Sequence, residues 1–432
     1  MIFLLRIVVT ILFTASLYAL PFSIVKKETD IQHTPTLLVI GGIHGNEPGS
    51  YFATALLSEY YTIKKGNLWI IPDLNRLSIQ RNSRGINGDM NRKFAEIGSH
   101  DPDLNIVTEA QKIITEPQVG LILNLHDGHG FYRKEYQNTI FNPNAWGQTC
   151  VIDQGILEGI QPFGNLNEIA SKVSQLLNGE LIETHHLFDV RNTNTRFDDE
   201  AMQHSLTYFA VTHNKPAFAI ETSKNLPTLP LKVFYQLRAI ESYMKIMGIE
   251  FQSSFNLTPE NIEKILDTPG NVTINNNIYL NLKNLKNSLS FIPLQSVQND
   301  FKFSHPLGSV QRNKNGYDLF IGNRKISTLI PSYQREDNRS LSTTIAIDGE
   351  PKNIEFATDF FASADFKVIN HDPDTRVNII GFTKQGVKDE SNLRITLNDL
   401  DFKYSIDTLH KSYRIEFYRQ NCFCGMVLVH FK

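Results

Sequence analysis

The first half of the chain carries short, almost wholly apolar runs separated by stretches in which apolar residues recur with helical spacing. The apolar runs lie at 37–40, 68–72, 121–125 and 217–220. Runs of this kind are typical of strands buried on both faces of a helix-covered parallel or mixed sheet. Helical spacing falls between and after them, at 49–61, 105–114, 166–177 and 231–246. The pattern predicts an α/β domain over residues 21–249.

The pattern changes near residue 250. One short helix is expected at 259–266 with Thr258 as its cap. Beyond it, polar and apolar residues alternate with the period of two that half-buried strands show. The alternating segments lie at 272–282, 317–321, 342–347, 394–397 and 413–417. We therefore expect two small all-β domains, a β-barrel-like one over 250–338 and an immunoglobulin-like β-sandwich over 339–432.

The first twenty residues have a different character from the rest. Arg6 precedes an apolar run, and the small residues Ala15, Ser16 and Ala19 follow it. This order is typical of a secretory signal peptide, here 1–20 with cleavage near Ala19, although an uncleaved anchor stays open. We accordingly expect an exported, periplasmic protein with no membrane span after cleavage.

Composition narrows the function further. The net charge is −3, and the chain has no run of basic residues. Both observations argue against nucleic acid as a partner and against electrostatic attachment to a membrane. The three cysteines do not indicate a disulfide framework. Cys422 and Cys424 lie on the same face of an expected strand, where core packing is the better interpretation.

Chemically distinctive residues follow the apolar runs. His44 and Glu47 lie in the glycine-rich loop 41–49 after the first run, His126 closes the third, and Glu221 closes the fourth. Two imidazoles and one carboxylate make a complete catalytic zinc ligand set, and a further glutamate near the metal is a natural general base. Taken alone, the loop could equally be a glycine turn with a surface histidine and a helix-capping glutamate.

A polar run at 84–94 lies between these features. Asn91 and Arg92 are suited to binding a carboxylate, with the guanidinium giving two parallel hydrogen bonds. Arg84 could stabilise an oxyanion, and Asp89 could accept the second N–H of a ligating histidine. For Arg84 or Asp89 considered singly, a basic turn with a satisfied surface aspartate is the better interpretation.

Taken together and in this order, the motifs resemble the zinc carboxypeptidases of the carboxypeptidase A type. They are His-x-x-Glu, Asp-x-Asn-Arg-x-Phe, a strand ending in His and a strand ending in Glu, and they cover about the first half of the chain. The run 84–92, the His-Asp-Gly-His-Gly loop and the appended β domains are most similar to one group in that family. Its members are periplasmic DL-carboxypeptidases that trim peptidoglycan tripeptides and set helical cell shape in Helicobacter and Campylobacter.

The resemblance implies a role for each matching residue. Zn²⁺ would be held by His44, Glu47 and His126, with Asp89 supporting His44. Glu221 would take a proton from the attacking water and later give it to the leaving amine. The resemblance further implies that Arg84 steadies the oxyanion and that the substrate's terminal carboxylate is bound by Asn91 and Arg92. The family's mobile tyrosine has no firm counterpart, and the role of Tyr208 stays open.

The same resemblance implies a substrate. It implies cleavage between γ-D-glutamate and meso-diaminopimelate, which leaves a dipeptide. Diaminopimelate carries an additional carboxylate and amine that need polar partners in the pocket. Arg133 and the aromatic Trp146 are our candidates for that pocket, with Arg191 and Arg196 as further loop residues that could line it.

Two other functions fit parts of the sequence. A zinc deacylase of the aspartoacylase or succinylglutamate desuccinylase type shares two of the motifs, but such enzymes are usually cytoplasmic. A non-catalytic wall-binding protein is compatible with the β domains, which could also contact other cell-shape proteins. Glu221 argues against a pure binding protein, because binding alone needs no base at that position.

Overall fold

A computed structural model describes residues 21–29, 34–159, 163–337 and 342–432. The predicted signal peptide at 1–20 therefore lies outside the described residues. Within those ranges, none of the helices combines the length and apolar character needed to cross a bilayer.

The α/β part is built on a seven-stranded mixed sheet with the strand order β1-β4-β2-β5-β10-β8-β9. The four predicted apolar strands are its adjacent, parallel centre, as β4 (Asn67–Ile71), β2 (Thr36–Ile40), β5 (Val119–Gly128) and β10 (Ala217–Ser223). The flanking strands are β1 (Val25–Glu28), β8 (Thr149–Ile152) and β9 (Asp189–Asn192), and β1 and β8 run antiparallel to their central neighbours. The predicted fold class is confirmed.

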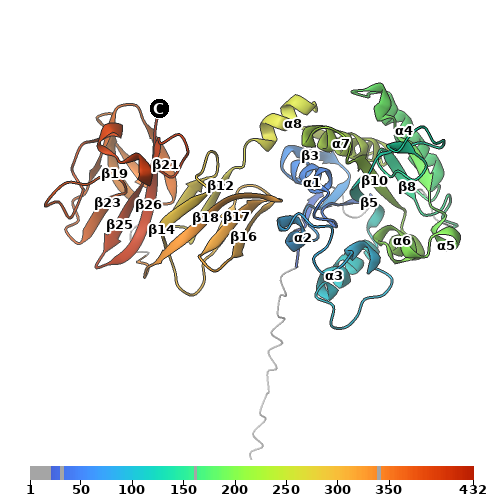
Figure 1. Ribbon diagram of the computed structural model, residues 1–432, viewed down its shortest axis with the longest axis horizontal. Coiled ribbons are helices and arrows are strands. Elements are labelled where there is room, and N and C mark those ends of the chain that lie inside the picture. Colours follow the sequence, from blue (N-terminus) through green and yellow to red (C-terminus); the bar gives the residue numbers. More distant parts are fainter. Residues whose placement is uncertain (1–20, 30–33, 160–162, 338–341) are drawn as a thin grey trace, which may run out of the picture.

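Helices cover both faces of this sheet (Figure 1). One side carries α1 (Pro48–Tyr60), α4 (Leu166–Asn178) and α7 (Leu229–Ile246), and α7 packs against both of the others. The other side carries α3 (Leu104–Thr115) and α6 (Leu206–Thr212), which contact β5 and β10. Short helices α2 (Arg76–Gln80) and α5 (Thr195–Asp198) lie in the connections. Because helices shield both faces, the central strands can be apolar on both sides.

Residues just beyond 249 still belong with the α/β part. Strand β11 (Glu250–Ser253) pairs antiparallel with β3 (Tyr61–Lys65), and helix α8 (Pro259–Leu266) packs on α7. The Thr258 side chain accepts a hydrogen bond from the Asn261 N–H at 3.3 Å, as expected of a cap. The short helix predicted at 259–266 is thus present, and wholly β structure begins after it, as expected.

Two small sheets follow, which we call the middle sheets. One has the order β13-β12-β15 and the other β14-β18-β17-β16. Their strands are β12 (Asn271–Ile274), β13 (Ile278–Asn281), β14 (Ser288–Leu294), β15 (Phe301–Phe303), β16 (Gly308–Arg312), β17 (Tyr317–Ile321) and β18 (Arg324–Tyr333). The expected single strand at 272–282 is a hairpin, because Asn275 and Asn276 adopt positive φ values of 53° and 58° and reverse the chain.

The last ninety residues form two facing four-stranded sheets, the C-terminal sandwich. Their orders are β20-β19-β22-β24 and β21-β26-β25-β23. The strands are β19 (Ser342–Ile347), β20 (Glu350–Glu355), β21 (Thr358–Ala362), β22 (Asp365–Ile369), β23 (Thr375–Ile379), β24 (Ile395–Thr396), β25 (Ser412–Arg419) and β26 (Cys422–Phe431). All three cysteines are free thiols, and Cys424 is buried.

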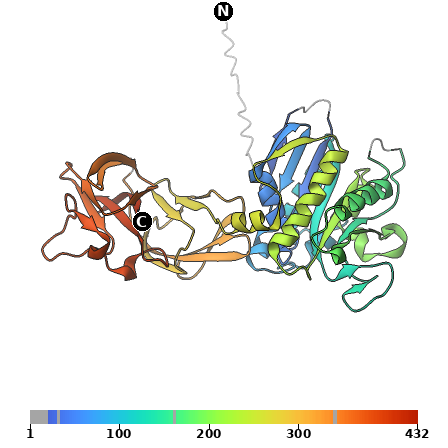
Figure 2. The same ribbon diagram turned by 90° about the horizontal axis from the view of Figure 1, so that it is seen from above.

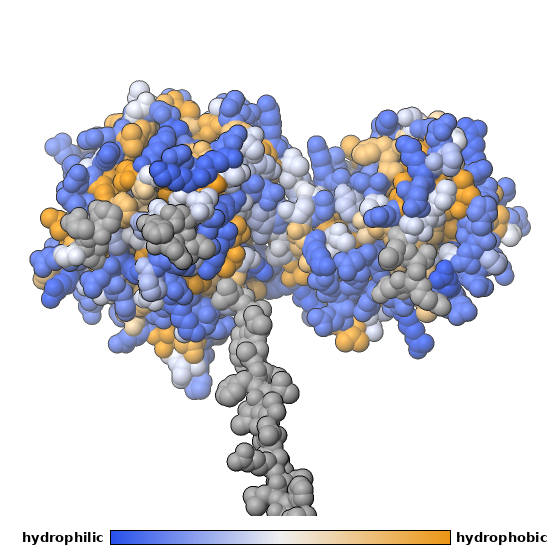
Figure 3. Space-filling model, turned by 180° about the vertical axis from the view of Figure 1, so that it is seen from behind, coloured by the Kyte–Doolittle hydropathy of each residue, from blue (hydrophilic) through white to orange (hydrophobic). Residues whose placement is uncertain are grey.

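Strand β26 joins the sandwich to the rest of the molecule. Val427 and Val429 point into the core between the two sandwich sheets. Met426 and Leu428, on its other face, belong to an apolar core that runs through the middle sheets into the α/β part. Figures 2 and 3 show the resulting elongated molecule, with the α/β part at one end and the sandwich at the other. Because one apolar core extends from the α/β part through the middle sheets to β26, we expect the α/β part, the middle sheets and the sandwich to keep fixed positions relative to one another.

Candidate active site

His44, Glu47 and His126 converge at the carboxyl ends of neighbouring strands. His44 and Glu47 lie in the loop between β2 and α1. Pro48 is the first residue of α1, a position where a backbone N–H has no partner within the helix, so that proline loses no hydrogen bond there. His126 lies within β5, the strand beside β2. One ligand atom from each residue lies within 4.8 Å of the others, and all three residues are buried.

The three side chains fit a divalent cation. Glu47 Oε2 is 2.9 Å from His126 Nδ1, and Glu47 Oε1 is 3.1 Å from His44 Nδ1. His126 Nε2 is buried without a hydrogen-bond partner, a costly state for a polar atom. Burial would raise the pKa of Glu47, but the two imidazoles outweigh it and hold that pKa well below its usual range. Two nitrogen ligands and one carboxylate suit Zn²⁺.

Asp89 orients the first of these imidazoles. Its Oδ1 is 2.8 Å from His44 Nε2, while its Oδ2 accepts a 2.9 Å hydrogen bond from Arg84 Nε. Burial opposes the charge on Asp89, yet the hydrogen bond to His44 lowers its pKa. A carboxylate on the far nitrogen of a ligating histidine sets its tautomer. This is the contact that the resemblance implied for Asp89.

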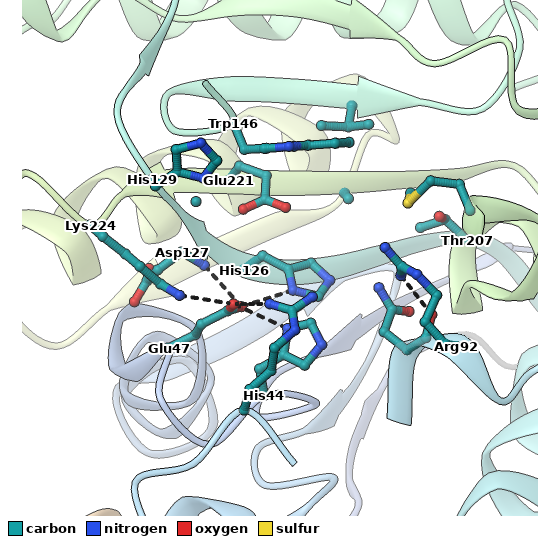
Figure 4. Close-up of a pocket in the computed structure, with 16 residues that line it drawn as sticks. His44, Glu47, Arg92, His126, Asp127, His129, Trp146, Thr207, Glu221 and Lys224 are labelled. Carbon is teal, nitrogen blue, oxygen red and sulfur yellow. Dashed lines mark hydrogen bonds and ion pairs between the residues drawn. The ribbon is translucent and has the colours of Figure 1, made fainter. Parts of the chain in front are cut away.

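Glu221 faces the same space from the next strand. It lies in β10 directly beside His126 of β5 in the parallel register (Figure 4). Both residues lie inside their strands, which continue to Ser223 and Gly128, and do not close them as expected. Burial raises the pKa of Glu221, and the nearby Glu47 carboxylate adds to the effect. A carboxyl group with a raised pKa is suited to accepting and returning a proton.

A pocket of about 290 Å³ opens over these residues. The predicted residues Arg84, Asn91, Arg92 and Trp146 line it. Trp146 lies over Glu221, and Arg92 lies at the side of the pocket near Thr207 (Figure 4). The predicted residues His44, Glu47, His126 and Glu221 also line it, whereas Asp89 contacts His44 from outside the lining and Arg133 is absent from it.

Asn91 and Arg92 are held differently. The Asn91 side-chain oxygen accepts a 2.9 Å hydrogen bond from the Leu206 N–H, which leaves the amide N–H₂ as the donor end. Arg92 Nη1 donates to the Asn91 carbonyl oxygen at 2.9 Å. In the ranges that the structure describes, no ion pair to a carboxylate occupies Arg92. A guanidinium without a carboxylate partner in a pocket is suited to an anionic ligand.

Arg133 lies outside the pocket lining. Its guanidinium donates to the backbone oxygens of Tyr132 at 2.6 Å, His185 at 2.6 Å and Leu187 at 3.2 Å. These bonds direct it into a loop and away from the expected contact with substrate. The guanidinium carbon of Arg191 lies 3.9 Å from the centroid of the Trp146 ring, so Arg191 contacts a residue of the pocket wall without lining the pocket itself.

The remaining loop candidates are also displaced from the cavity. Arg196 lies over the Phe197 ring at 5.5 Å. Tyr208 lies in α6, where its backbone N–H bonds the Ser205 hydroxyl at 3.1 Å. The neighbouring Thr207, and not Tyr208, lines the pocket.

Three supporting residues were missed by the sequence analysis. Lys224 lines the pocket with its Nζ 3.3 Å from Glu47 Oε1, and Arg84 Nη1 reaches the same oxygen at 3.2 Å. Asp127 accepts a 2.8 Å hydrogen bond from the Gly49 N–H, which ties β5 to the start of α1. Gln236 of α7 donates to the His126 carbonyl at 2.7 Å. Lys224 and Asp127 lie close in sequence to predicted residues, whereas Gln236 carried no local signal.

Comparison with known families and structures gives consistent matches. A family model described as a carboxypeptidase controlling helical cell shape, catalytic, matches residues 2–267. A second, described as the C-terminal domain of a metallo-carboxypeptidase, matches residues 336–432. A search of curated proteins finds no match.

Several solved structures of one bacterial protein are similar over nearly the whole chain. Apo cell shape determinant Csd4 from Helicobacter pylori is 33% identical, with a TM-score of 0.88 over 95% of this chain and 100% of that one. Its tripeptide-bound form matches with 33% identity, the same coverage and a TM-score of 0.87. Its mDAP-bound form, described as a D,L-carboxypeptidase, is 32% identical over 94% of this chain and 100% of that one, with a TM-score of 0.88.

Proposed function

Because this chain belongs to the family of carboxypeptidases that control helical cell shape, we propose that it is a zinc-dependent D,L-carboxypeptidase of the cell wall. It removes C-terminal meso-diaminopimelate from the uncrosslinked peptidoglycan tripeptide and leaves the dipeptide. The solved tripeptide and mDAP complexes of Csd4 support this choice of substrate. The observation that carries the proposal is the meeting of His44, Glu47, His126, Glu221 and Arg92 at one pocket.

His44, Glu47 and His126 are the residues that would hold the metal. When bound there, Zn²⁺ supplies a Lewis acid for the scissile carbonyl and acidifies water. The pKa of His44 is raised to about 9: burial works against the proton, but the Glu47 and Asp89 carboxylates outweigh it. His44 must therefore lose a proton before it can act as a ligand, so metal uptake depends on pH.

Glu221 is the general base. Its carboxylate takes the proton of the attacking water and returns it to the leaving amine of diaminopimelate. Burial in the pocket favours the protonated form, which is the form that must donate in the second half of the reaction. Arg84, tied to Asp89 and Glu47 and lining the pocket, supplies the positive charge that stabilises the developing oxyanion.

Asn91 and Arg92 bind the terminal carboxylate of the substrate. The Asn91 amide has a fixed orientation and, among the described residues, no carboxylate forms an ion pair with Arg92, so both donors are available for this ion. Trp146, stacked on Arg191, forms a rigid wall against the rest of the diaminopimelate side chain. Arg133 contributes to binding only by holding the loop around Leu187 in place.

The remaining parts of the proposal concern location and domains. A signal peptide at 1–20 would export the protein to the periplasm, where peptidoglycan lies. The chain would divide into the catalytic domain from 21, a middle β domain up to 338 and a sandwich from 339. The matches of separate family models to 2–267 and 336–432 support this division.

The direct test is a digestion of defined substrates. The purified protein is incubated with muramyl tripeptide, with and without a chelator, and released diaminopimelate is measured together with bound metal. We expect release that the chelator abolishes and added zinc restores. No release from the tripeptide, combined with turnover of N-acyl amino acids, would show a deacylase instead.

A further inference from the structure

Strand β14 holds an exposed phenylalanine in a strained conformation. Phe291 has a φ of +58° and is 71% exposed. A bulky side chain rarely adopts the left-handed region, because its Cβ crowds the backbone there. Such strain persists only where the surrounding structure imposes it, and it concentrates at functional sites. Burial offers no explanation here, because the ring points to solvent.

The surrounding structure does impose this conformation. The pairing of β14 with β18 slips between Leu289 and Ile292, so Ser290 and Phe291 form a bulge. A buried arginine from the C-terminal sandwich clamps it: Arg414, 4% exposed, donates through Nη1 to the Phe291 carbonyl at 3.1 Å. Its Nη2 donates to the Ser290 carbonyl at 3.3 Å. The two β parts together therefore hold the ring outward.

The ring stands at a cavity between these parts. The cavity measures about 510 Å³, within the range of roughly 300–1,000 Å³ typical of small-molecule sites. A second aromatic residue, Tyr404, lines it, together with Lys286 and Lys403. Three serines, Ser288, Ser290 and Ser405, and three aliphatic residues, Leu289, Ile380 and Ile406, complete the lining. The buried Arg414 Nε, in the same lining, has no hydrogen-bond partner.

We propose that this cavity binds saccharide units of the peptidoglycan glycan strand and so holds the enzyme on its polymeric substrate. Aromatic rings pack against the C–H faces of sugars, while hydroxyl, ammonium and guanidinium groups bond their oxygens. Lysine and serine are depleted in the centres of protein–protein interfaces, which argues against a protein partner. The lysines are themselves engaged, Lys286 with the Phe402 and Lys403 carbonyls at 3.2 Å and Lys403 with Asp401 at 2.9 Å, so a strongly anionic ligand fits less well.

The location suits this role. Residues of the middle sheets and of the C-terminal sandwich line this cavity, whereas residues of the α/β part line the catalytic pocket. Figure 1 shows the α/β part and the sandwich at opposite ends of the molecule. Glycan bound here would leave the catalytic pocket free for a peptide stem. The inference rests on the proposed function for the identity of the polymer, but not for the existence of the site.

The test uses Phe291→Asn in the full chain. Asparagine tolerates positive φ, so the bulge can persist while the aromatic face is lost. We expect co-sedimentation with purified, protein-free sacculi to weaken by roughly tenfold in affinity, with unchanged kcat/KM on soluble muramyl tripeptide. We also expect Tm to hold or rise, because strain is relieved. The matched control is Phe361→Ala, an aromatic residue 59% exposed on β21 outside the cavity lining, which should bind sacculi normally.

Each outcome decides the question. Normal sacculus binding by Phe291→Asn overturns the saccharide site. Binding that requires proteins attached to the sacculi also overturns it, in favour of a protein partner. If the unmodified chain binds sacculi through Phe291 but releases no diaminopimelate from soluble tripeptide, the site stands and the proposed catalytic function fails.

Discussion

At the scale of single residues, the arrangement around Glu221 separates metal binding from proton transfer. Glu221 lies beside His126 across two parallel strands, but it is not among the three residues whose ligand atoms converge. We expect Glu221→Gln to retain zinc and to lower kcat by about a hundredfold to ten-thousandfold, the usual contribution of a general base. Metal analysis and single-turnover rates check this, and a metal-free variant would contradict the assigned role.

Arg92 and His126 make a complementary pair of single-residue tests. Arg92 has no described carboxylate partner and lies away from the ligand cluster, whereas His126 is part of it. Arg92→Ala should keep zinc and raise KM by roughly 10- to 100-fold, the loss expected for a charge-assisted hydrogen bond. His126→Ala should instead empty the site. Equal zinc loss in both variants would show that Arg92 supports the metal and not the substrate.

At the scale of elements, the loop between β2 and α1 depends on its close approach to α2. A Cβ added at Gly45, between His44 and Glu47, would lie 2.0 Å from the Ser78 carbonyl carbon and oxygen. Gly45→Ala must therefore push the loop off α2, at a cost of about 1–3 kcal/mol for an overpacked contact. We expect lower Tm and weaker zinc affinity together, measured by thermal unfolding and competition with a chelator.

The matched control for that substitution is Gly98→Ala. A Cβ at Gly98 meets nothing within 4 Å, and its φ is not positive. This variant should keep both Tm and zinc affinity. If the two alanine variants behaved alike, the contact between the ligand loop and α2 would not be what fixes the metal site.

At the scale of the whole molecule, His305 lies at the contact between the middle sheets and the α/β part, and its protonation should affect the stability of the fold. Its ring contacts Phe52 of α1, with centroids 6.5 Å apart, and its Nδ1 accepts a 3.1 Å hydrogen bond from the Leu307 N–H. Burial, assisted by the Arg324 charge, lowers its pKa to about 4. In the unfolded chain this histidine has the ordinary pKa of about 6.5. As the pH falls, His305 is therefore protonated in the unfolded state before it is protonated in the folded state.

Stability should therefore fall as the pH drops from about 6.5 toward 4, by up to about 1.4 kcal/mol per pH unit from this residue. Above pH 6.5 both states hold neutral histidine and the contribution is constant. His305→Gln should lose stability less steeply over that window, as measured by urea unfolding of both proteins at each pH. Parallel curves would show that this contact does not exclude the proton.

Much of the architecture was accessible from local pattern. The central strands are apolar on both faces, and Pro48 starts a helix after the glycine loop, because burial and backbone geometry act over a few residues. The same local order placed His44, Glu47, His126 and Glu221 near the carboxyl ends of strands, where parallel sheets present their side chains together. The fold class and the convergence of those four residues could therefore be predicted.

Other features depend on which distant segments meet. The register that puts Glu221 beside His126, the Gln236 bond to the His126 carbonyl and the exclusion of Arg133 from the pocket all depend on atoms supplied by remote elements. The same holds for β26, whose two faces join different cores, and for the Arg414 clamp on Phe291. Packing across the folded chain decides where a side chain points and which strand pairs with which. The interactions that select these arrangements join residues far apart in the sequence, so no short stretch of sequence contains them.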